Sequence, residues 1–191
     1  MKIRLQGEQG TTIVEVVIAT AILATLMAGL MSLAAVAIST TENQGHLGAR
    51  TTEYAQDKME QLLALTYGDT SSDTRTFPAT NSGGSGLAVG GSSTPSAPVA
   101  LYVDYLDEKG NLCGLRDSGG TLVAACDSPV GTTPPTGWFY QRVWKIDDNS
   151  SHPTELPVDL KRITVSSTIA RGFGGAMKAQ STLTVLKARG F

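Results

Sequence analysis

The sequence is poor in the residues that metalloproteins and many enzymes rely on. Its 191 residues include two cysteines, two histidines and only 6% aromatic residues. The histidines, His46 and His152, are far apart in the chain, and no Cys-x-x-Cys spacing occurs, so the ligand set of a zinc site is lacking. The net charge of -2 provides no basic excess for a nucleic-acid partner. We therefore expect no cofactor, no metal and no nucleic-acid partner.

A second absence is confined to the N-terminal region. Between Val16 and Ile38 there is no charged residue, no histidine, no asparagine or glutamine and no proline. A helix needs about 20 such residues to cross the hydrocarbon core of a bilayer. The run predicts a membrane-spanning helix. Because Lys2 and Arg4 precede it and residues 16–41 carry no basic residue, we expect the leader in the cytoplasm and the chain after Thr40 outside.

One carboxylate stands where this apolar run begins. An ionised side chain at bilayer depth costs about 3 kcal/mol, so Glu15 predicts a functional site with a cationic partner. Cleavage after Gly10 would create that partner as the new α-amino group of Thr11. This amine would lie four residues from Glu15, about one helical turn away, or would be available to a neighbouring copy.

The stretch from Gly10 to Glu15, between a short basic leader and the apolar run, resembles the class III signal of type IV pilins and pseudopilins. In that family a membrane aspartyl peptidase, the prepilin peptidase, cuts after the glycine and methylates the new amino terminus. The resemblance implies that Gly10 ends the leader and that Thr11 begins the mature chain and receives the methyl group. Glu15 then becomes the fifth mature residue. The family usually has Phe or Met where this chain has Thr11.

Two other interpretations of the N-terminal region remain open. The first is an ordinary secretory signal, because Ala35-Val36-Ala37 fits a small-x-small cleavage site. The apolar part of such signals is usually about 7 to 15 residues long, which this run exceeds. The second is an anchor that is never cleaved.

The helix is expected to continue beyond the membrane. No proline occurs from Thr11 to Tyr67, and a helical period places Thr52, Ala55, Met59, Leu62, Leu63 and Thr66 on one face. A single helix from about residue 11 to about residue 66 would be about 80 Å long. Gly45 and Gly48 each cost roughly 1 kcal/mol relative to alanine, so a kink is expected between residues 39 and 48.

The rest of the chain predicts a loop followed by a sheet. Residues 68–98 are rich in Ser, Thr, Gly and Pro and predict a surface loop. A phosphate-binding loop also needs a Lys followed by Ser or Thr at the start of a helix, and this segment is not followed by that pair. Strand-like stretches follow at 99–106, 138–146, 160–170 and 179–187. We predict an α+β fold in which the long N-terminal helix packs on a C-terminal antiparallel sheet of about four strands.

This order of elements is similar to the architecture of type IV pilins. Residues 57–63, 141–148, 160–165 and 182–185 resemble the minor pilins called type IV pilus modification proteins. The resulting division is a cleaved leader (1–10), a transmembrane and assembly helix (11–40), an amphipathic helix (41–67), a loop (68–98) and an antiparallel β domain (99–191).

Cys113 and Cys126 would both lie in an oxidising compartment, where we expect them to form a disulfide rather than remain free thiols. A bridge closing a loop of about 14 residues would stabilise the domain by roughly 3 kcal/mol in the chain-entropy model.

Catalytic patterns are weak. A Ser-His-Asp arrangement could be built only on His152, whose neighbours Ser150, Ser151 and Pro153 predict a turn, and no nucleophile elbow occurs. The stretch from Asp147 to Ser151 offers oxygen ligands for weak calcium binding, but it lacks the glycine and closing glutamate of an EF-hand.

These observations favour a non-enzymatic structural subunit. The resemblance implies a minor pilin or pseudopilin that is held in the inner membrane by one span, with its N-terminus cytoplasmic and its C-terminal domain periplasmic. Its partners would be the prepilin peptidase, other pilin or pseudopilin subunits and the assembly platform, and its role would be to initiate a type IV pilus-like filament. The alternatives are a minor pseudopilin of a type II secretion system, a membrane-anchored binding or enzyme domain, and a secreted adhesin beginning at Ile38.

Overall fold

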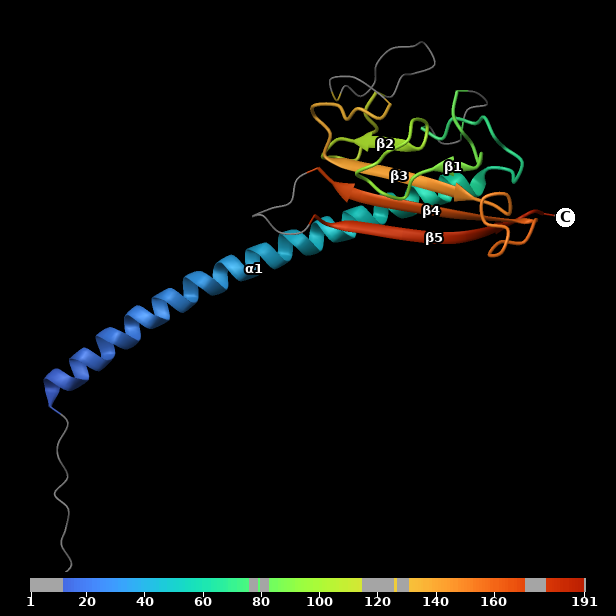
Figure 1. Ribbon diagram of the computed structural model, residues 1–191. Coiled ribbons are helices and arrows are strands. Elements are labelled where there is room, and N and C mark those ends of the chain that lie inside the picture. Colours follow the sequence, from blue (N-terminus) through green and yellow to red (C-terminus); the bar gives the residue numbers. More distant parts are fainter. Residues whose placement is uncertain are drawn as a thin grey trace, which may run out of the picture. The chain divides into compact units, whose positions relative to one another are not determined.

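One long helix and an antiparallel sheet form the described part of the chain (Figure 1). The structure is a computed structural model that describes residues 12–75, 79, 83–114, 126, 131–170 and 178–190. Its elements are α1 (Ile13–Ala64), β1 (Gly90–Gly91), β2 (Val103–Leu106), β3 (Tyr140–Asp147), β4 (Leu160–Ile169) and β5 (Gln180–Ala188). The chain divides into two compact units, Met1–Asn43 and Gln44–Phe191, and α1 contributes to both. The predicted α+β fold is confirmed.

α1 begins with a side-chain cap. The Oγ1 atom of Thr12 accepts a hydrogen bond from the backbone N–H of Glu15 at 3.3 Å, and Thr12-Ile13-Val14-Glu15 has the residue spacing of a capping box. Further along, the hydroxyls of Thr20 and Thr25 donate to carbonyl oxygens of the preceding turn. Helical hydroxyls in the apolar stretch are thus satisfied within the helix, as an apolar environment requires.

The sheet is built around β3. Every residue of β3 pairs with β4, and β5 pairs with β4. β1 and β2 pair with different stretches of β3, and all of these pairings are antiparallel. Three predicted strands lie within two residues of β3, β4 and β5. The predicted strand over 99–106 is wrong in its first half. There the backbone N–H of Tyr102 donates to the carbonyl of Val99 in a turn, and Leu101 has a positive φ of 67°.

β1 lies in the segment that was predicted to be loop. Its two glycines both have positive φ, at 142° for Gly90 and 83° for Gly91. A Cβ atom on Gly91 would lie 2.2 Å from the carbonyl oxygen of Trp144 and 2.7 Å from the Tyr102 ring. Only glycine allows the backbone to approach β3 this closely.

The C-terminal half of α1 covers one face of the sheet (Figure 1). Ala55, Met59 and Leu62 pack against a row of apolar side chains from β3 and β4, namely Trp144, Ile146, Ile163 and Val165. The predicted helix face is correct at Ala55, Met59 and Leu62, but Leu63 is 36% exposed. Tyr54 and Lys58 are buried instead, so the covered stripe is rotated relative to the predicted one.

A charged layer crosses this otherwise apolar interface. Asp104 of β2 accepts hydrogen bonds on one carboxylate oxygen, Oδ2, from Lys58 Nζ and Arg142 Nη2, both at 2.9 Å. Lys58 also donates to the backbone oxygen and the hydroxyl of Thr74, at 3.0 and 2.8 Å. Arg142 reaches the half-exposed Asp57 of α1 at 2.6 Å. We call Lys58, Asp104 and Arg142 the ionic layer; it joins α1, β2 and β3.

Among the described residues, Lys58 is the most completely buried cation. Its side chain is completely buried, and Nζ lies 4.0 Å from the centroid of the Trp144 ring. Burial lowers the pKa of Lys58 to about 8, although the Asp104 carboxylate opposes this shift. The ammonium is therefore held by four contacts and remains costly to bury.

Substituting Lys58 is expected to destabilise the domain strongly. Lys58→Met fills a similar volume but leaves Asp104 buried with Arg142 alone, so we expect the free energy of unfolding to fall by roughly 3 to 5 kcal/mol. Urea unfolding measures the loss, and the exposed Lys109, changed to Met, is the matched control and should alter stability little. Combining Asp104→Asn with Lys58→Met should recover part of the stability that Lys58→Met loses. An equal effect of the two single lysine variants would contradict the structural role of the ionic layer.

Stability should also rise with pH above about 8. An unfolded lysine has a pKa near 10.5, so between pH 8 and 10 the unfolded chain binds more protons at position 58 than the folded chain. Raising the pH therefore favours the folded state, by at most about 1.4 kcal/mol per pH unit for this group. Unfolding measured at pH 7.5, 8.5 and 9.5 should show a steeper rise for the native chain than for Lys58→Met. Parallel pH profiles would rule out Lys58 as the source.

Candidate functional site

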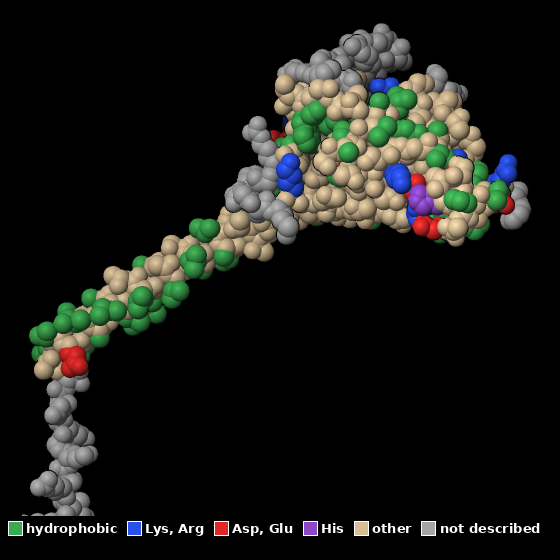
Figure 2. Space-filling view, viewed as in Figure 1, with side chains coloured by type: hydrophobic (Ala, Val, Ile, Leu, Met, Phe, Trp, Pro, Cys, Tyr) green, Lys and Arg blue, Asp and Glu red, His purple; other side chains and the backbone are tan. Residues whose placement is uncertain are grey.

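The first half of α1 is apolar on every side. The large hydrophobic side chains from Ile13 to Ile38 are all at least 50% exposed, and Figure 2 shows hydrophobic side chains along this part of the helix. The most apolar stretch of α1 has a mean hydropathy of 2.3, and no part of that stretch is buried. A helix that is hydrophobic all round needs either a protein core or lipid around it. α1 is thus long and apolar enough to cross a membrane.

The predicted processing site is only partly described. Gly10 and Thr11 lie outside the described residues, so their cleavage stays a prediction. Glu15 occupies the first turn of α1, where its backbone N–H is capped by Thr12 and its carboxylate is favoured by the helix dipole. It also lines a shallow depression of about 340 Å³ together with Val16, Ala19, Thr20 and Leu23.

The N-terminal cap of α1 is not among the features predicted from the sequence. The signal was the Thr-x-x-Glu spacing at residues 12–15, which is typical of a helix start. Glu15 can therefore stabilise the helix end of its own chain as well as attract an amine. A test of its function has to separate these two effects.

An ionic cluster closes the far end of the sheet. The carboxylate of Asp147 on β3 accepts from Lys145 at 2.9 Å and from Arg162 at 3.2 Å, and Arg162 also reaches Glu155 at 3.1 Å. Burial raises the pKa of Asp147, but hydrogen bonds from Lys145 and Arg162 outweigh it and leave the pKa below its ordinary value. The cluster ties β3 to β4 and to the connection between them.

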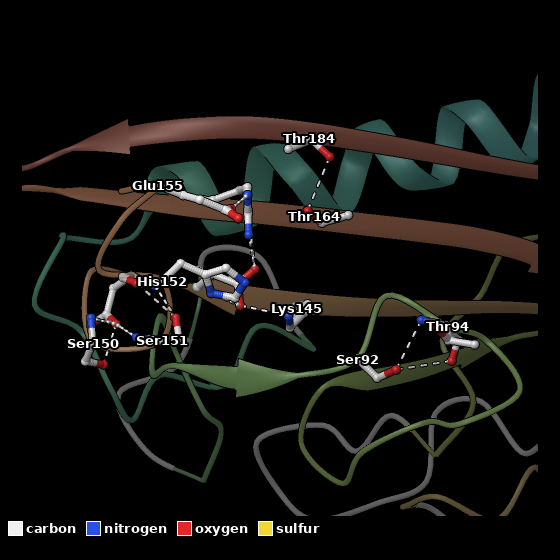
Figure 3. Close-up of polar contacts among 12 residues, drawn as sticks. Ser92, Thr94, Lys145, Ser150, Ser151, His152, Glu155, Thr164 and Thr184 are labelled. Atoms are coloured by element: carbon white, nitrogen blue, oxygen red, sulfur yellow. Dashed lines mark hydrogen bonds and ion pairs between the residues drawn. The ribbon is translucent and has the colours of Figure 1, made fainter. Parts of the chain in front are cut away.

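His152 lies beside this cluster on the connection from β3 to β4 (Figure 3). Its Nδ1 atom is 3.8 Å from Asp147 Oδ1, beyond hydrogen-bond range, and has no hydrogen-bond partner among the described residues. The hydroxyls of Ser150 and Ser151 both turn to Asp148 instead. Within the described chain, the structure does not bring a serine hydroxyl and His152 together.

The stretch considered for calcium is occupied by internal contacts. Asp147 is taken by Lys145 and Arg162, and Asp148 accepts from the side chain and backbone of Ser150. The hydrogen bond from the Ser150 hydroxyl is the main reason that the pKa of Asp148 is lowered. In the part of the chain that the structure describes, no group of three or more His, Cys, Asp or Glu side chains could hold a metal ion.

The predicted disulfide is confirmed. Cys113 and Cys126 are joined, and both are buried, at 3% and 6% exposure. The backbone N–H of Cys113 donates to the carbonyl of Tyr105 on β2 at 2.8 Å. The bridge therefore fastens Cys126 to the sheet, on the face that α1 does not cover.

No family model, curated protein or solved structure matches this chain. A long, apolar N-terminal helix whose second half packs on an antiparallel sheet is compatible with a pilin-like fold. The resemblance of the chain to pilins thus depends on this architecture and on the sequence from Gly10 to Glu15.

Proposed function

We propose that this chain is a minor pilin or pseudopilin, a non-enzymatic subunit of a type IV pilus-like filament. The proposal rests on two features of α1: an exposed apolar run of membrane length that carries no charge, and a single acid in the first turn, just before that run. That acid lies five residues after Gly10, in the pattern of a prepilin signal. A helix that served only as a tether would need neither the acid nor the glycine.

In the proposed mechanism, prepilin peptidase removes residues 1–10 and leaves an ammonium group on Thr11. Glu15 of an incoming subunit neutralises this ammonium on its own chain or on a neighbour. The pairing is selective because an unpaired charge surrounded by apolar helices is strongly penalised. Addition of a subunit is thereby coupled to the presence of a cut, correctly placed amino terminus.

Small residues on α1 support close packing with other subunits. Ala, Gly and Ser recur along the apolar half, at positions 19, 21, 24, 28, 29, 32, 34, 35 and 37. In lipid, where hydrophobicity no longer drives helices together, small residues let backbones approach closely. The proposed partners are prepilin peptidase, other pilin or pseudopilin subunits and an assembly platform in the inner membrane.

The proposal places the N-terminus in the cytoplasm and residues 44–191 in the periplasm before assembly. The basic leader residues Lys2 and Arg4 favour this orientation. The disulfide supports it, because such bridges persist in oxidising compartments. As a minor subunit, the protein would act in priming the filament.

The mature amino terminus decides among the proposed function and its alternatives. We expect mass spectrometry of the protein isolated from its native membrane to find a chain beginning at Thr11, with one added methyl group. Coexpression with and without prepilin peptidase is the control. A chain retaining Met1 would indicate a permanent tether, and one beginning at Ile38 a secreted domain.

Two substitutions separate charge pairing from helix capping at Glu15. Glu15→Gln keeps a residue that can complete a capping box, and Glu15→Leu does not. If charge pairing matters, both variants should insert in the membrane but enter filaments at a small fraction of the native level, measured by immunoblotting of sheared filaments. Glu42→Gln, an exposed acid on the same helix, is the control and should assemble normally. Native incorporation of Glu15→Gln would leave only a capping role and would contradict the mechanism.

A further inference from the structure

The face of the sheet opposite α1 carries a groove. It has a volume of about 610 Å³ and lies between the sheet and two loop segments, residues 93–98 and 132–138. Its floor is one row of side chains across four strands: Tyr105 pairs with Gln141, Gln141 with Thr168, and Thr168 with Gln180. Because side chains alternate between faces, this row points away from the adjacent Arg142, Ser167 and Ser181, which face α1. We call this site the outer groove.

One wall of the outer groove is fixed in place by covalent and polar contacts. Cys126 is bound to Cys113, and the backbone N–H of Gly137 donates to the Cys126 carbonyl. The hydroxyl of Tyr105 donates to the carbonyl of Thr132 at 3.1 Å, and the Trp138 ring meets the Tyr105 ring edge-on at 5.5 Å. Trp138 is thus held at the groove by the floor itself.

The other wall is a short rigid loop. Pro95 and Pro98 restrict its backbone, and the backbone N–H of Thr94 donates to the hydroxyl of Ser92 at 3.1 Å (Figure 3). Ser92 is itself anchored to β3 through a backbone hydrogen bond to Trp144 at 3.1 Å. A groove with such walls is formed before a ligand arrives, which lowers the entropic cost of binding.

The chemistry of the lining indicates a ligand class. Among the described lining residues there is no carboxylate and one ammonium group, Lys178, and the rest offer amides, hydroxyls, prolines, aromatic rings and the aliphatic Ile169. Gln141 is 6% exposed, so the accessible amide of the floor is that of the exposed Gln180, which carries donors and an acceptor together and suits neighbouring hydroxyl groups. The electron-rich face of an aromatic ring such as Trp138 attracts C–H groups. Hydroxyl edges beside C–H faces are the surface of a sugar ring.

A peptide fits this groove less well. The floor residues Gln141 and Thr168 lie on β3 and β4, which are paired on both sides, so a peptide lying over them meets no free main-chain groups; β5 pairs with β4 alone and is an edge of the described sheet. Recognition of proline-rich peptides uses several exposed aromatic rings, whereas Tyr105 is only 3% exposed and, among the described lining residues, Trp138 is the one aromatic platform that remains. We propose that the outer groove binds a neutral oligosaccharide. This inference is independent of filament assembly.

The two tryptophans allow a direct test. Trp138 lines the groove, and Trp144 is 2% exposed on the α1 side of the sheet, so their two indole N–H signals report on different places. The full chain, kept in a phosphocholine detergent because alkyl glycosides carry a sugar, is first screened on an array of neutral and acidic glycans. The bound neutral glycans, with maltotriose, cellotriose and chitotriose, are then titrated into ¹⁵N-labelled protein. We expect a saturable shift of the Trp138 signal, assigned with Trp138→Phe, while the Trp144 signal stays in place.

Variants on β5 supply the matched pair. Gln180→Ala removes an exposed amide from the groove and should weaken binding by about tenfold, the loss that corresponds to one or two good contacts. Thr184→Ala alters the same face of the same strand outside the groove and should leave the affinity unchanged. Circular dichroism verifies that both variants are folded.

Several results would overturn the inference. They are the absence of neutral glycan binding by the folded chain, equal affinity of the Gln180→Ala and native proteins, or a shift of Trp144 in place of Trp138. Binding restricted to acidic glycans would assign the site to Lys178 and an anion. A shift of Trp138 by decaproline but by no saccharide would make the groove a peptide site.

Discussion

The carboxylate of Asp104 holds the C-terminal half of α1 and the sheet in one register. It is contacted by Lys58 from the helix and Arg142 from β3, and its side chain is 1% exposed. A buried ion pair of this kind contributes little net stability compared with apolar packing, but breaking it is costly. Sliding the helix by one turn would separate Lys58 from Asp104 and Asp57 from Arg142, and it would leave the buried Lys58 ammonium without its carboxylate. The ionic layer therefore specifies position, while Leu62, Ile146 and their neighbours supply most of the burial.

One continuous helix serves two environments. Residues 44–64 alternate buried and exposed side chains because the sheet covers one face, whereas the residues before them expose apolar side chains on every face. The first stretch needs lipid or neighbouring helices, and the second is complete within its own domain. The helix is thus built so that the folding of the domain and the packing of the anchor can proceed separately.

Much of the fold could be predicted from the sequence, and the reasons for the exceptions are physical. The absence of proline and the regular apolar spacing located α1, β-forming residues between turn residues located β3, and alternation located β4 and β5. The burial of Lys58 was not predicted. A local sequence pattern cannot show that Asp104, 46 positions later, forms an ion pair with it. The predicted start of β2 was wrong because Leu101 adopts a left-handed backbone conformation. A leucine rarely adopts this conformation, and alternation of side chains does not reveal it.

The candidate sites divide in the same way. Gly10, Thr11 and Glu15 form a local pattern, so they could be identified from the sequence, and their processing and pairing stay predictions. The disulfide was predicted from two cysteines in a domain expected to be exported, and the disulfide itself is confirmed. The outer groove could not be predicted, because Tyr105, Gln141, Thr168 and Gln180 become one row only through the pairing of four strands. The Cys113–Cys126 bridge has one more effect: it makes the wall that carries Trp138 dependent on an oxidant. A copy in a reducing compartment would lack that brace, so under the periplasmic location proposed above, maturation of the groove would be timed by export rather than by synthesis.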